Sequence, residues 1–101
     1  MKEKEYYKRI DYYREQINAI DKILSGLLSL RFMMVEEIAS HKKKLKIRIT
    51  DKKRESEVID SIRKELQKAS KLKNYPNKKI QKLIINVFKD IIKHSKKIQS
   101  A

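Results

Sequence analysis

The sequence predicts an all-α fold built from three helices. Among its 101 residues there is only one glycine and one proline, the two residues that fit least well in a helix interior. Ile, Leu, Lys and Glu are abundant, and apolar residues recur at spacings of three and four. We expect one domain over residues 1–101, small enough that a deep core requires chains to associate.

The first predicted helix runs from about residue 6 to about residue 45 and contains no proline. In alternating steps of four and three, an apolar seam passes through Ile17, Leu24, Leu28, Val35, Ile38 and Leu45. Charged residues interrupt this seam at Arg14, Asp21, Arg31 and Lys42. Further apolar residues beside the seam predict packing on more than one side of the helix: Ile20, Ile23, Leu27, Leu30 and Met34.

Two shorter helices follow. Residues 46–50 alternate too briefly for a strand and are expected to form an extended connector. Asp51 then caps a helix over about residues 51–70, whose predicted buried face is Ile59, Ile62, Leu66 and Ala69. Residues 71–79 contain Asn-Tyr-Pro-Asn and form the predicted linker. The last helix covers about residues 78–99, with Ile84, Phe88, Ile91 and Ile92 facing inward.

The composition is strongly basic, with 27 Lys and Arg against 13 Asp and Glu and a net charge of +14. Such a balance favours nucleic acid, an acidic membrane surface or a small anion as partner, but a lysine-rich composition on solvated faces would give the same balance. The chain has no cysteine, which excludes disulfides and thiolate metal sites. No apolar run approaches the roughly 20 residues of a membrane span, and the charged start does not resemble a secretory signal. We expect a soluble cytoplasmic protein.

Arg31 and Lys42 occupy seam positions where apolar residues are expected. Burial of a cation is costly unless an anion meets it, and neither residue has a carboxylate three or four positions away on the helix. Two interpretations stay open. The side chains can reach solvent along the edge of the seam, or they can meet an anionic ligand.

Polar residues on the other helices bear on this choice. Ser95 and Gln99 are spaced i, i+4 and continue the inward face of the third helix, and Glu55 opens the inward face of the second. Each alone could be an ordinary polar residue at a helix end. Together with Arg31 and Lys42 they would surround one cavity between helices, where sites in helical proteins are built.

Arg14 lies 17 residues before Arg31 on the same helix, about 25 Å away at 1.5 Å per residue. That separation is too large for both arginines of one chain to share a small ligand. An antiparallel second copy that crosses near residue 25 would bring its Arg14 opposite the interval from Arg31 to Lys42. Gly26 falls at this crossing and would allow close approach, although a helix can also simply tolerate a glycine. We therefore expect a symmetric dimer with two equivalent shared sites.

Four segments together resemble the AroQ-class chorismate mutases, the all-helical family, over about residues 10–99. "YYREQINAIDKILSGLLSLR" is similar to the family's opening, with an Arg, an Ile-x-x-Ile-Asp block and a second Arg. "EEIASHKKK" supplies the family's lysine, "DKKRESEVI" its Asp-x-x-Arg-Glu signature, and "IIKHSKKIQ" its closing Ser-x-x-x-Gln. The resemblance implies three helices per chain in an intertwined homodimer.

The resemblance also implies roles for these residues. Arg31 and the partner subunit's Arg14 would hold the two carboxylates of chorismate, with Ser95 assisting. Lys42 and Gln99 would donate to the ether oxygen of the breaking bond. Arginine suits bidentate carboxylate binding, and lysine suits a charge concentrated on one oxygen.

Glu55, with the backbone near Asp51, would take the ring hydroxyl of the substrate, and Arg54 would lie close by. The implied reaction is the unimolecular rearrangement of chorismate to prephenate in phenylalanine and tyrosine biosynthesis. It requires a flexible dianion held in its reactive shape and donors aimed at the oxygen that gains charge. We expect no metal and no cofactor.

Three alternatives remain. One is isochorismate-pyruvate lyase, an enzyme that resembles the mutase in fold and has nearly the same cationic pocket. Only the Glu55 contact favours chorismate over isochorismate as substrate. A basic helical nucleic-acid-binding protein would show a basic stripe with interleaved aromatic residues, whereas the tyrosines here cluster near the N-terminus. A catalytically idle dimerisation module would leave the seam cations unexplained.

Overall fold

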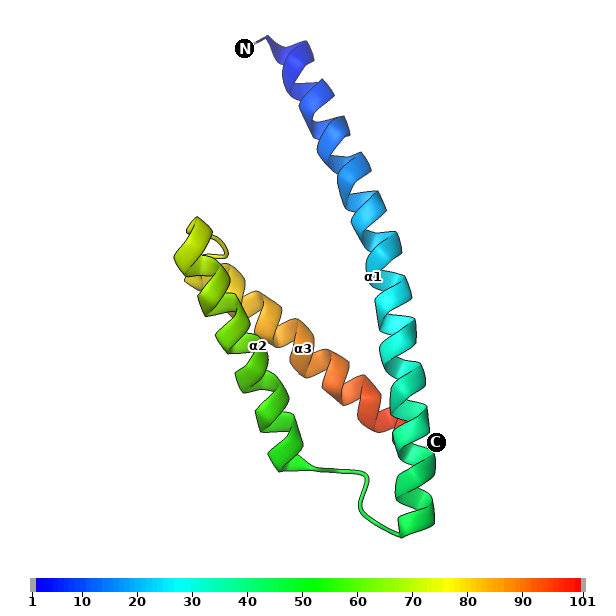
Figure 1. Cartoon of the computed structure of the whole chain (residues 1–101). Coiled ribbons are helices and arrows are strands. Elements are labelled where there is room, and N and C mark those ends of the chain that lie inside the picture. The colour runs from blue at the N-terminus through cyan, green and yellow to red at the C-terminus, as the bar shows by residue number, and fades with distance from the viewer. Residues whose placement is uncertain (1, 101) are drawn as a thin grey trace. The chain divides into compact units, whose positions relative to one another are not determined.

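The computed structural model describes residues 2–100 and has three helices, α1 (Glu3–Leu45), α2 (Lys52–Lys73) and α3 (Lys78–Gln99), with no strand among these residues (Figure 1). The prediction of an all-α chain with three helices is confirmed. α1 begins at Glu3 rather than near residue 6, and Glu3 and Glu5 place negative charge in its first turn, where the helix dipole favours it. No helix in residues 2–100 combines the length and apolar character needed to cross a membrane.

The connector between α1 and α2 is fixed at both ends. α1 ends at Leu45. The next residue, Lys46, has a left-handed backbone with φ of 57°, and the Ile47 N–H donates to Lys42 O at 3.1 Å. At the other end, Asp51 is extended and its side chain accepts a hydrogen bond from Arg54 N at 3.0 Å. This is the predicted N-cap, and it defines where α2 starts.

α2 and α3 pack against each other and are joined by residues 74–77 (Figure 1). The linker is shorter than the predicted residues 71–79, because α2 continues to Lys73 and ends only at Asn74. Asn74 adopts the left-handed conformation, and its N–H donates to Ser70 O at 2.9 Å. Asn77 then caps α3 by accepting from Ile80 N at 3.0 Å.

The predicted inward faces of α2 and α3 are confirmed except for Ala69 on α2, and each face includes at least one further residue. On α2, Ile59, Ile62 and Leu66 are half-buried, but Ala69 is exposed and Ser70 is half-buried instead. The face therefore continues from Leu66 by a step of four residues and not three. On α3, the four predicted apolar residues are half-buried, and Ile85, which was not predicted, is buried with 6% exposure.

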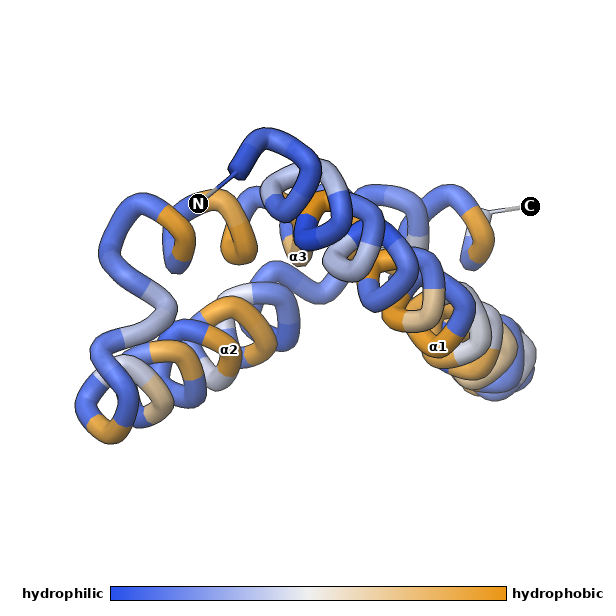
Figure 2. Tube along the Cα trace, turned by 90° about the horizontal axis from the view of Figure 1, so that it is seen from above, coloured by the Kyte–Doolittle hydropathy of each residue, from blue (hydrophilic) through white to orange (hydrophobic). Residues whose placement is uncertain are grey.

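The described chain divides into two compact units between Met34 and Val35, inside α1. The first unit is a single helical segment, so it has no second element to cover its apolar residues. Ile17, Ile20 and Ile23 are each more than half exposed. Figure 2 shows such apolar positions recurring along α1. A helix face of this kind normally packs against another surface.

Candidate functional site

Lys42 and Gln99 meet in the second unit. Lys42 lies in the last turn of α1, Gln99 is the last residue of α3, and 57 positions separate them in sequence. The Lys42 Nζ atom lies 3.3 Å from Gln99 Oε1 and 2.9 Å from the carbonyl oxygen of Ile49. Lys42 and Gln99 are both half-buried. The structure thus brings a cation and a carboxamide from two helices to one point.

This contact determines which atoms of the pair remain available to a ligand. An ammonium group has three N–H donors and no acceptor, so two of the donors of Lys42 are used and one remains. Because the ammonium can only donate, the Gln99 atom that faces it is the carbonyl oxygen, and the amide Nε2 of Gln99 is left to donate elsewhere. The pair therefore offers one charged and one neutral donor.

Glu55 forms the second contact of the site. It lies in the first turn of α2, and its Oε1 is 2.6 Å from the Nζ of Lys96 on α3. The backbone N–H of Glu55 donates to Asp51 O at 3.0 Å, so the cap of α2 also fixes where this side chain begins. Lys96 was not among the predicted residues. Its position between Ser95 and Gln99 was the only available signal, and a lysine-rich chain makes such a signal weak.

The last turns of α3 supply one residue to each of these two contacts, Gln99 to Lys42 and Lys96 to Glu55. Ser95, Lys96 and Gln99 fall within five residues, a rise of about 6 Å along the helix. Ser95 is buried with 6% exposure, and its hydroxyl donates to Ile91 O at 2.8 Å. Donation from this hydroxyl to a ligand would require it to turn away from Ile91.

The other two predicted residues of α2 and its cap lie nearer to solvent. The Asp51 carboxylate is occupied by capping, so its contribution is to hold the backbone that carries Glu55. Arg54 is exposed, and its Nη1 lies 3.8 Å from Glu57 Oε2. An exposed pair at this distance contributes little to stability.

Arg14 and Arg31 both belong to the first unit. Arg14 is exposed and Arg31 is half-buried. The second unit by itself therefore holds Lys42, Glu55 and Gln99 of the predicted set, together with Ser95, Asp51 and Arg54. The roles predicted for the two arginines stay predictions.

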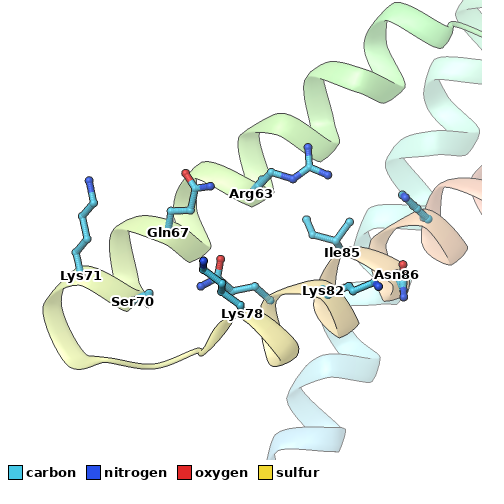
Figure 3. Close-up of a pocket in the computed structure, with 10 residues that line it drawn as sticks. Arg63, Gln67, Ser70, Lys71, Lys78, Lys82, Ile85 and Asn86 are labelled. Carbon is cyan, nitrogen blue, oxygen red and sulfur yellow. The ribbon is translucent and has the colours of Figure 1, made fainter.

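A groove between α2 and α3 extends away from this site. Its part beside Glu55 has a volume of about 600 Å³ and is lined by both acidic and basic residues, among them Asp60 and Lys96. The part nearer the turn, of about 650 Å³, is lined by five basic residues and no carboxylate. Figure 3 shows Arg63 and Gln67 on α2 and Lys78 and Lys82 on α3, the two helices that border it. Among residues 2–100, no three His, Asp or Glu side chains gather as a metal site would require.

Comparison with known protein families identifies a match over most of the chain. The model of a family described as chorismate mutase type II matches residues 13–100, a stretch that includes every predicted site residue from Arg14 to Gln99. Comparison with curated proteins and with solved structures found no match.

Proposed function

The chain belongs to the chorismate mutase type II family and is therefore an isomerase of aromatic amino acid biosynthesis, and we propose that it rearranges chorismate to prephenate in a site built around Lys42 and Gln99. The observation that carries the proposal is the hydrogen bond from Lys42 Nζ to Gln99 Oε1. It joins the two residues that the proposed mechanism places beside one substrate oxygen, although 57 positions separate them in the sequence.

The chemistry explains why a lysine and a glutamine suit this place. In the rearrangement the ether C–O bond of chorismate breaks while a C–C bond forms, and negative charge grows on the ether oxygen. The free N–H of Lys42 and the amide of Gln99 would both donate to that oxygen. Donors that are already in place stabilise such charge without reorganisation during the reaction. No covalent intermediate is formed, so neither residue has to act as a nucleophile.

Binding of the two substrate carboxylates falls to arginines. Arg31 would hold one carboxylate and the partner subunit's Arg14 the other, each through a bidentate contact. Ser95 would assist by turning its hydroxyl from Ile91 O toward a carboxylate. Two fixed carboxylates restrict the flexible side chain of chorismate to the folded shape in which the reacting carbons are close.

The dimer that supplies the second Arg14 would be built on the exposed apolar face of α1. In an antiparallel pairing about residue 25, the two copies would cover each other's apolar residues. Gly26 would lie at the crossing point, and a Cβ built on Gly26 meets nothing within 4 Å in its own chain. The chain's own packing therefore gives no reason for a glycine there, whereas close approach of a second helix would.

The proposal is tested by adding chorismate to the purified protein and following both the loss of its absorbance and the identity of the product. Prephenate is expected. Lys42→Met should abolish most of the turnover, whereas Lys44→Met, which removes the same charge from an exposed neighbour, should leave it close to that of the wild type. If the protein did not convert chorismate but released pyruvate from isochorismate, it would be the lyase of the same fold, and the proposal would be wrong.

A further inference from the structure

The ion pair between Glu55 and Lys96 joins α2 to α3 beside the proposed site. Its atoms are 2.6 Å apart, the shortest separation among the described ion pairs, and the side chains are 26% and 41% exposed. The other described pairs, Arg54 with Glu57 and Arg63 with Asp60, link neighbouring turns of one helix at 3.3 Å or more. The Glu55–Lys96 pair thus differs from them in length, in burial and in joining two helices.

The pairing with Lys96 leaves one carboxylate oxygen of Glu55 available to accept a hydrogen bond from a ligand. The ammonium of Lys96 takes Oε1, so Oε2 remains as an acceptor. The backbone of Glu55 is fixed at the same time by its bond to Asp51 O. A glutamate side chain loses rotamer entropy when it is immobilised, and here part of that loss precedes ligand binding.

Lys96 also changes the electrostatics that a ligand would meet. Chorismate carries two carboxylates, and the negative charge of Glu55 would oppose their approach. A cation held against Glu55 offsets this charge and leaves its capacity to accept a hydrogen bond. A neighbouring cation therefore favours the use of a carboxylate as acceptor in a site for a dianion.

We propose that Lys96 is a positioning residue for substrate recognition, which holds and neutralises Glu55 so that its Oε2 accepts the ring hydroxyl of chorismate. This inference rests on the proposed function. The ring hydroxyl takes no part in bond breaking, so its contact is made equally in the ground state and in the transition state. Loss of Lys96 should therefore raise KM and leave kcat nearly unchanged.

The experiment compares Lys96→Met with the wild type in chorismate turnover, with Lys97→Met as the control for loss of one positive charge at the same end of α3. Lys96→Met should raise KM about five- to tenfold, the effect expected when one typical hydrogen bond to the substrate is weakened. Lys97→Met should change KM less than twofold, and Lys96→Arg should restore most of the affinity. Circular dichroism checks that each variant is folded.

Two further measurements separate positioning from a direct or merely structural role. In a Glu55→Gln background, Lys96→Met should have little further effect, because Lys96 acts through Glu55. With a chorismate analogue that lacks the ring hydroxyl, the KM difference between Lys96→Met and the wild type should disappear. Additive effects of the two substitutions, or an unchanged KM in Lys96→Met, would refute the inference while the activity stands. A wild-type protein without chorismate turnover would refute the proposed function and this inference with it.

Discussion

Gln99 offers the sharpest test of the proposed chemistry, because Gln99→Glu changes one donor into a charge with almost no change in shape. In the structure Gln99 Oε1 accepts from Lys42 Nζ at 3.3 Å, which leaves the amide N–H groups for the ether oxygen. A carboxylate at this position would still accept from Lys42, so the helix ends should stay in place. It could not donate while ionised.

The expected loss follows from two effects. Removing one preorganised donor to a developing oxyanion costs about 2.7–4 kcal/mol, or roughly 10²–10³ in kcat. Replacing it with a negative charge adds repulsion against the same oxygen, and an ionised carboxylate would also draw the Lys42 ammonium toward itself. We expect Gln99→Glu to lose at least about a further factor of ten relative to loss of the donor alone. Gln99→Met, which has neither donor nor charge, isolates the first effect.

The assay is kcat for chorismate as a function of pH for the three proteins. The wild type should vary little across the neutral range, since a carboxamide does not titrate, and Gln99→Met should be low and equally flat. Gln99→Glu should be lowest at neutral pH and should recover as the pH falls, because the protonated carboxyl group can donate again. If Gln99→Glu followed the wild-type pH profile, Gln99 would not touch the reacting oxygen.

Four other predictions follow from the described residues. Mixing Arg14→Ala with Arg31→Ala should restore part of the lost activity, because one of the two sites in a heterodimer would be intact; no recovery after verified subunit exchange would argue against shared sites. Lys42→Ala should lose most of the activity but keep its helicity by circular dichroism, since its side-chain bonds to Ile49 O and Gln99 Oε1 are not part of the helical backbone. Near-full turnover would disprove its role. Gly26→Leu should weaken dimerisation, measured by sedimentation. If Gly26 were merely tolerated in the helix, the leucine would instead stabilise the helix by about 0.8–1.0 kcal/mol. Duplex DNA should bind weakly to the basic groove of Figure 3 and dissociate at moderate salt in a fluorescence anisotropy titration, and binding that survives such salt would favour a nucleic-acid function.

The elements of this fold were predictable because local rules decide them. Periodicity and the near absence of glycine and proline give three helices, and Asp51 caps α2 as its type and position indicate. The end of α2 was placed three residues too early. A run of lysines around Leu72 carries no stop signal, and the helix ends only where Asn74 can adopt a left-handed backbone.

The contacts of the site were predictable only in part. The inward faces of the helices already placed Lys42 and Gln99 around one cavity, and the family resemblance added that both act on one oxygen. Lys96 was missed because no local pattern distinguishes it from the other lysines of α3, and only the packing of α3 on α2 brings it to Glu55. The bond from Lys42 to Ile49 O was beyond any sequence pattern, since a backbone carbonyl has no side-chain signature.

The exposed apolar face of the first unit has a consequence for folding. Most of the stability of a helix in a protein comes from packing of its apolar face, and within this unit only α1 itself is present. Under the proposed pairing, each chain would supply the packing that the other chain's helix lacks. Folding and assembly would then be one equilibrium governed by mass action, and each tenfold dilution would lower the free energy of unfolding per dimer by about 1.4 kcal/mol. The amount of this protein that a cell makes would thereby set how stably each copy is folded.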